Sequence, residues 1–336
     1  MTAQIPSPAH RPLRTVLIGT SLEEESDRVV RSGLAVARTA GARICLVHAA
    51  RMVVGLVETE LAPDLMRERV AWCEEQLRQQ IARLGIGPSE LDNAELPEAR
   101  VLAGSPHFVL IEAARAAGAD LIVVGATGSG PFAAELLGST ADRVLRKATC
   151  PVLVVRGEPR VPPRRVLAPV DLSPLSADSF RCGMQLLAQL ANSGEIEVRA
   201  VFALSFLEMA AQRQEAAGDL PLALIERQSA GELERFLAEN RPEAPLRVET
   251  AVLSGEARFE ILHELSEQPY DLVMLGTHGR GGLDRMVLGS VAATVARKAP
   301  CSVLMVSPEA ALGEGIAEAV LARTTPAWHR DTPPSG

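Results

Sequence analysis

The chain has 336 residues, of which 47% are hydrophobic, 23% are charged and only 3% are aromatic, and its formal net charge is -8. This length suits about two domains, and the composition is that of a globular protein with an aliphatic core. The acidic balance argues against a nucleic-acid partner, and no apolar run approaches the roughly 20 residues that a membrane-spanning helix needs. The five cysteines and six histidines show no metal-ligand spacing. We therefore expect a cytoplasmic protein without a metal site.

The first half alternates short apolar runs with amphipathic segments. Ser21 and Glu24 have the spacing of a capping box, so a helix is expected to begin there and to end near Gly41. Further helices are predicted at 66–84, 108–117 and 139–147. Strands are predicted at 15–20, 44–49, 99–103, 121–124 and 152–155.

The second half repeats this order. Ser173 is a good N-cap, and Pro174 takes the favoured first helical position. Strands are predicted at 166–170, 196–202, 247–252, 272–275 and 303–306. Short apolar strands separated by helices indicate an α/β fold with a parallel sheet that is covered on both faces.

The two halves are related by duplication. Residues 119–155 align without a gap on residues 270–306, at an offset of 151, and 17 of the 37 positions are identical. A period this long indicates duplicated domains rather than a solenoid. We expect a disordered arm (1–13), a first domain (14–156), a Pro-rich linker (157–163), a second domain (164–308) and a largely disordered C-terminal extension (309–336).

Each half carries a glycine-rich loop with the spacing Gly-x2-Gly-x9-Gly-Ser after its fourth strand. Glycine lets the backbone approach a ligand closely, and the last glycine and serine open a helix, whose N-terminus favours a phosphate. Ligands of open parallel sheets bind at this carboxyl edge. The alternative is that the glycines only shape the fold. The loop residues are Gly125, Gly128, Gly138 and Ser139 in the first half, and Gly276, Gly279, Gly289 and Ser290 in the second.

The second loop, from Gly276 through Leu288-Gly289-Ser290-Val291-Ala292 to Lys298-Ala299-Pro300-Cys301, resembles the signature of the universal stress protein family. The resemblance covers about 14–155 and 165–306. It implies two doubly wound domains, each with a five-stranded parallel sheet of order 3-2-1-4-5 and helices on both faces. In the nucleotide-binding branch of that family, ATP lies between the first and fourth strands.

The resemblance also implies the residues that contact the nucleotide. An aspartate that ends the first strand corresponds to Asp171, although Asp171 can also be read as a turn carboxylate beside Ser173. The matching residue of the first half is Ser21, so a carboxylate is missing there and weaker binding is expected. The implied second-half contacts are Asp171, Ala203, Gly276, Gly279, Arg280, Gly289, Ser290 and Val291. Those of the first half are Ser21, Ala49, Gly125, Gly128, Gly138, Ser139 and Thr140.

These features favour a regulatory protein of the stress response that binds ATP, with Mg²⁺ accompanying it, chiefly in the second half. One alternative is an interaction or structural module that binds no nucleotide. A slow ATP hydrolase is the third reading, but the chain has no Walker lysine and no clear general base, so no catalytic residue is assigned.

The last strands of both halves are short and apolar, and the implied topology puts them at sheet edges. An uncovered edge of this kind invites aggregation, so we expect the two halves to pair through 152–155 and 303–306 as an intramolecular pseudo-dimer. A homodimer and protein partners are further expectations that the sequence does not specify.

Overall fold

A computed structural model describes residues 12–51, 62–87, 99–126, 137–158, 160–191, 196–206, 209–210, 221–241, 246–277 and 288–307. The predicted C-terminal extension lies outside these residues, as does the predicted N-terminal arm apart from Pro12 and Leu13. Leu13 is buried, and its N–H donates to Gln189 Oε1 of the second half at 2.6 Å.

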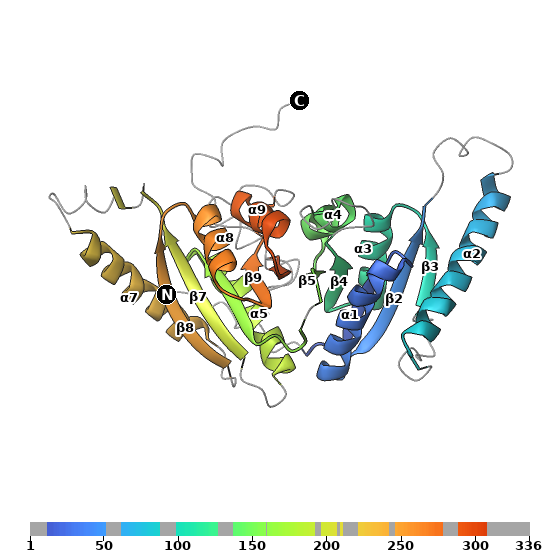
Figure 1. The fold of residues 1–336 in the computed structure, drawn as a ribbon, viewed down its shortest axis with the longest axis horizontal. Coiled ribbons are helices and arrows are strands. Elements are labelled where there is room, and N and C mark those ends of the chain that lie inside the picture. Colours follow the sequence, from blue (N-terminus) through green and yellow to red (C-terminus); the bar gives the residue numbers. More distant parts are fainter. Residues whose placement is uncertain are drawn as a thin grey trace, which may run out of the picture.

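The first half alternates strands and helices in the predicted order (Figure 1). Its elements are β1 (Thr15–Thr20), the 3-10 helix η1 (Glu24–Ser26), α1 (Asp27–Ala40), β2 (Arg43–Ala50), α2 (Ala62–Arg83), β3 (Ala99–Ala103), α3 (Pro106–Ala117), β4 (Leu121–Gly125), α4 (Ser139–Lys147) and β5 (Val152–Val155).

The second half follows the same plan. Its elements are β6 (Arg165–Val170), α5 (Pro174–Leu190), β7 (Ile196–Leu204), α7 (Leu222–Asn240), β8 (Leu246–Ser254), α8 (Ala257–Glu267), β9 (Leu272–Gly276), α9 (Ser290–Lys298) and β10 (Ser302–Val306).

The first helices of the two halves begin differently. Ser173 caps α5 as predicted, because its side chain accepts a hydrogen bond from the N–H of Ser176 at 3.2 Å. The capping box predicted at Ser21 is wrong. The chain first forms the 3-10 turn η1, and α1 starts only at Asp27. The capping-box spacing fails because the hydroxyl of Ser21 donates to Glu23 Oε2, at 3.4 Å, and does not accept from a backbone N–H.

All strands belong to one ten-stranded sheet of order β3-β2-β1-β4-β5-β10-β9-β6-β7-β8. Each half therefore has the expected order 3-2-1-4-5 with parallel pairing. The halves join through β5 and β10, which pair antiparallel with Leu153 opposite Leu304 and Val154 opposite Val303. The expected pairing of the last strands is thus confirmed, and it converts two apolar edges into the centre of a continuous sheet.

Helices cover both faces of this sheet, and each face has a core that runs across both halves. Helices α1, α2, α5 and α7 pack on one face, and α3, α4, α8 and α9 pack on the other. Helices α2 and α7 lie at opposite ends of the molecule, whereas α4 and α9 lie near its middle (Figure 1). Helix α1 approaches the sheet so closely that a Cβ at Gly33 would lie 2.6 Å from Ile18. Among the described helices, none is long and apolar enough to cross a bilayer.

Candidate functional site

The first and fourth strands of each half diverge at their carboxyl ends. Pairing between β6 and β9 ends at Leu167 and Val273, three residues before the last residue of either strand. In the first half, pairing of β1 with β4 ends at Ile18 and Val123. The strand order reverses at this same place, so each half has the switch-point crevice in which open α/β sheets bind ligands.

Asp171 lies directly after β6 at the mouth of the second crevice. Its Oδ1 accepts from the N–H of Ser173 at 3.0 Å, and its own N–H donates to Ser176 Oγ at 3.2 Å. The turn role that the sequence suggested is therefore present. These two bonds orient the carboxylate at the strand end. The register of β6 with β7 ends with Val170 opposite Phe202, so Asp171 follows at the level of the half-buried Ala203.

The second glycine loop is closed at its base by the backbone. The N–H of Gly289 donates to Thr277 O at 2.8 Å, so the end of β9, at Gly276, lies beside the start of α9. No side chain of the described residues caps this helix. The first hydrogen bond within helix α9 runs from the N–H of Ala293 to Gly289 O. The N–H groups of Ser290 and Val291 come before Ala293 in the first turn, where helical N–H groups have no partner within the helix. Gly279 and Arg280 lie outside the described residues.

The first glycine loop has the same frame. The N–H of Gly138 donates to Ala126 O at 2.6 Å, next to Gly125, and no described side chain caps α4. Ser139 is exposed and Thr140 is half-buried, as are Ser290 and Val291 respectively in the second half. Gly128 lies outside the described residues. Both halves therefore present a helix N-terminus to the crevice, which is a favourable place for an anion.

The end of β1 in the first crevice differs from the end of β6 in the second. Ser21 is exposed, and its hydroxyl contacts Glu23 rather than a turn of the backbone. Ala49, at the matching position of β2, is buried. The structure brings Ser21 and Ala49 to the expected edge of the sheet but supplies no carboxylate at the end of β1.

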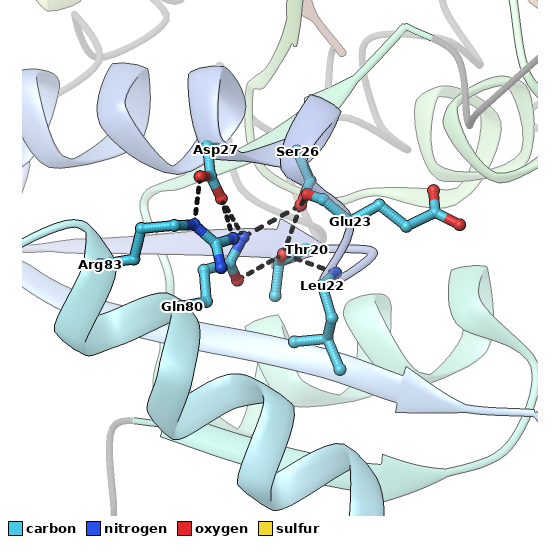
Figure 2. A network of polar contacts seen from close by, with 7 residues as sticks. All are labelled: Thr20, Leu22, Glu23, Ser26, Asp27, Gln80 and Arg83. Carbon is cyan, nitrogen blue, oxygen red and sulfur yellow. Dashed lines mark hydrogen bonds and ion pairs between the residues drawn. The ribbon is translucent and has the colours of Figure 1, made fainter.

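A buried polar network instead ties the end of β1 to helix α2 (Figure 2). Gln80 is fully buried, and its Oε1 accepts from the hydroxyl of Thr20 at 2.8 Å. Its Nε2 donates to Ser26 Oγ at 3.1 Å and to Asp27 Oδ1 at 2.7 Å. Arg83 completes the network with two hydrogen bonds of 2.8 Å to the Asp27 carboxylate.

This network sets the charge of Asp27. Burial alone would raise the pKa of its carboxyl, but the hydrogen bonds from Arg83 and Gln80 outweigh burial and hold the pKa below its usual range. The carboxylate is therefore ionised and fully engaged inside the first half. It is therefore not available as a carboxylate for the end of β1.

His48 lies beside the same strand end, where its Nδ1 is 2.9 Å from Thr20 O. Burial lowers the pKa of His48, and the charge of Arg69 adds to this effect. The imidazole is consequently neutral near pH 7, and its bond to Thr20 is structural.

Sequence reasoning missed two leucines. Leu22 and Leu172 follow the first strand of each half, and both have positive φ, 69° and 62°. A branched side chain rarely adopts this conformation, and such strain accumulates at ligand sites. Because leucine gives no signal of positive φ, only the shared position in both copies could have drawn attention to them.

The network of Figure 2 was missed for another reason. Gln80 and Arg83 are polar residues on a helix whose partners lie more than 50 positions away in the chain. Their helical spacing indicates only an ordinary amphipathic face. Among the described residues, no group of three or more His, Cys, Asp or Glu side chains could hold a metal ion.

The fold and these crevices define a class: a tandem pair of doubly wound α/β domains, each with a glycine loop that opens a helix at the switch point. The chain belongs to the universal stress protein family, whose model matches residues 12–156 and again 163–307.

Some relatives match most of this chain, and others match about half of it. Universal stress protein Rv2005c of Mycobacterium tuberculosis is 30% identical over 305 residues, which cover 86% of this chain and 96% of the relative. A universal stress protein from Thermus aquaticus is 30% identical over 143 residues, 43% of this chain and 98% of its own length. The crystal structure of a universal stress protein from Archaeoglobus fulgidus has the same fold, with a TM-score of 0.56 and 22% identity, over 87% of this chain and 96% of that one.

Proposed function

We propose that this protein binds ATP in the crevice of its second half and acts as a nucleotide-dependent regulator in the stress response. One observation carries the proposal. Asp171 follows β6, and the uncapped N-terminus of α9 is held to the end of the neighbouring strand β9 by the bond from Gly289 to Thr277. A carboxylate and an anion-binding helix end therefore meet at one edge of the sheet.

The two groups suit the two ends of a nucleotide. A carboxylate accepts hydrogen bonds from sugar hydroxyls, and the first-turn N–H groups around Ser290 and Val291 favour the phosphates. Gly276, Gly279 and Gly289 would let the backbone approach them, while Arg280 would add a positive charge and Ala203 would border the base. Mg²⁺ would enter as part of the nucleotide, held mainly by phosphate oxygens.

We propose unequal affinities in the two halves. A hydrogen bond to a charged group contributes about 1.5–3 kcal/mol and a neutral one about 0.5–1.5 kcal/mol. Asp171 would accept charged hydrogen bonds from the nucleotide, whereas Ser21 could make only one neutral hydrogen bond to it. The difference corresponds to about tenfold in affinity or more, because about 1.4 kcal/mol is tenfold.

Titration calorimetry of the full chain with ATP tests the proposal. We expect Asp171→Asn to weaken binding about tenfold, because the charge is lost while the side-chain shape is kept. Ser21→Ala is the matched control and should leave the tighter site unchanged. Mass analysis of small molecules released from the denatured protein should detect an adenine nucleotide. Wild-type protein that binds no ATP, or an Asp171→Asn variant with unaltered affinity, would contradict the assignment.

The first half also supports a second function, that of an interaction module. The network that joins Thr20 to Gln80 and Asp27 makes the end of β1 part of the core of that half rather than part of a ligand site. In that case the nucleotide occupies the second half alone and the first half acts through its surface. A calorimetric stoichiometry of one ATP per chain would favour this division, and two per chain would oppose it.

A further inference from the structure

The first half contains a cavity of about 230 Å³ at the end of the sheet opposite to the glycine loops. It lies between helix α3 and the face of strands β2 and β3 on which α3 packs, near the first residues of β1 and β2. The residues that matter for its chemistry are Thr15, Arg43, Cys45, Arg100, Leu102 and Ala113.

The second half offers an internal comparison. Strand register places Thr15 opposite Arg43 and Leu17 opposite Cys45, and in the second half it places Leu167 opposite Arg199. Cys45 therefore corresponds to Arg199. At the offset of the duplication, Ala113 corresponds to Glu264 and Ala119 to Tyr270.

Large polar side chains occupy this place in the second half. Arg199 Nε is 3.0 Å from Glu264 Oε1, and the hydroxyl of Tyr270 donates to the same oxygen at 2.6 Å. The guanidinium of Arg165 lies 5.2 Å from the centre of the Tyr270 ring. In the first half a thiol and two methyl groups, of Cys45, Ala113 and Ala119, replace Arg199, Glu264 and Tyr270, which leaves the space between sheet and helix open.

The charges that remain around the cavity are mostly positive. Arg43 is held at the wall, because its Nη2 donates to Thr15 Oγ1 at 3.0 Å. Arg100 is half-buried on the edge strand β3. Glu112 also borders the cavity, but its carboxylate is engaged by Arg115 on the same helix at 3.0 Å.

We propose that this cavity is a binding site for a small monocarboxylate with an apolar body. Arg43 and Arg100 would meet the carboxylate, while Leu102 and Ala113 would contact the body. A dry cavity of about 150 Å³ holds a benzene ring, so this cavity has room for a ring with a short carboxylate arm. The site is separate from the crevice proposed for ATP and does not depend on it.

Alkylation of Cys45 reports on the site in the full-length protein. Cys45 is half-buried and lines the cavity, whereas Cys182 is equally half-buried but packs against the other face of the sheet. The probe is 3-phenylpropanoate, and the neutral control is 3-phenylpropanamide. We expect the carboxylate to slow iodoacetamide labelling of Cys45, mapped by mass spectrometry, with no effect on Cys182. The amide should need about tenfold higher concentration, because it lacks the charge-assisted contacts.

Two variants make the test specific. Ala113→Glu introduces the residue that the second half carries at this place, so it should fill the cavity, repel the carboxylate and remove the protection. Arg43→Met should keep the cavity open but weaken protection about tenfold. Thermal melts would verify that both variants are folded.

Four results would overturn the proposal. The first three are an absence of protection by the carboxylate, equal protection by the amide, and protection that survives in Ala113→Glu. Labelling of Cys45 that rises on dilution of the protein would show instead that a second copy of the chain covers the cavity, and it would also overturn the proposal.

Discussion

The guanidinium of Arg156, just after the last strand of the first half, donates from Nη2 to the carbonyl oxygen of Ala296 at 2.7 Å. It also donates to Arg297 O at 2.9 Å, so a side chain of one half caps the C-terminal end of α9 in the other. The corresponding residue of the second half, Ser307, reaches Ala148 O after α4 at 3.4 Å. The helix proposed to bind phosphate is thus anchored at its far end by the neighbouring domain.

Replacing Arg156 with methionine is expected to destabilise the protein by about 2 kcal/mol, because carbonyl groups that accept from a charged donor are left buried without it. Burial lowers the pKa of Arg156, as expected for a buried cation, whose desolvation is costly unless such bonds are made. Urea unfolding measures the change. Lys298→Met, on an exposed position of the same helix, is the control. If Arg156→Met lowers the free energy of unfolding no more than Lys298→Met does, the bonds from Arg156 to α9 contribute nothing to stability.

Gly289→Val is expected to abolish ATP binding in the second half. Gly289 has φ -52° and ψ 145°, a conformation open to valine, so the fold should persist while the branched side chain blocks the helix N-terminus. Titration calorimetry of the full chain gives the result. Gly138→Val, at the same position of the first half, should leave the tighter site intact. If a folded Gly289→Val protein binds ATP with unchanged affinity, the phosphates do not bind at this loop.

Asp27→Asn should reduce the free energy of unfolding at pH 7 by about 2 kcal/mol, since it breaks charged hydrogen bonds to Arg83 and Gln80 in a buried place. The pKa of Asp27 is lowered by folding, so its contribution is present above the unfolded pKa and is lost as pH falls through the folded one. Wild type and variant should therefore converge in strong acid. Asp64→Asn, from an exposed pair with Arg67, should change stability by less than about 0.5 kcal/mol. If plots of the free energy of unfolding against pH stay parallel for wild type and Asp27→Asn down to low pH, the role of the network is contradicted.

His48 should make the protein less stable in mild acid. Its pKa is lowered by burial, so the unfolded chain binds the proton more readily than the folded one. Stability is therefore highest above the unfolded pKa and falls with pH below it, by at most about 1.4 kcal/mol per pH unit for one proton. Denaturant unfolding between about pH 7.5 and pH 5.5 should show a smaller slope in His48→Gln than in wild type. Equal slopes in wild type and His48→Gln would mean that folding does not lower the pKa of His48.

Much of the architecture follows from local sequence patterns. The strand ends, the starts of α4 and α9, and the position of Asp171 directly after β6 agree with the sequence, because apolar runs, glycines and the repeat at an offset of 151 are all visible along the chain. The capping box at Ser21 failed for a local reason, since a hydroxyl three residues before a glutamate has more than one partner within reach. The conformation of Leu22 and Leu172 left no trace in residue type.

The sequence by itself determined the α/β class, the duplication and the order of elements, because hydrophobic periodicity and turn residues act over a few neighbouring positions. Only the tertiary structure decided which distant residues those elements bring into contact. The bond from Arg156 to α9, the network of Gln80 and Asp27, and the cavity beside Cys45 join residues that are distant in the chain. Their existence depends on packing volumes and on which buried polar groups find partners, and no local pattern encodes either.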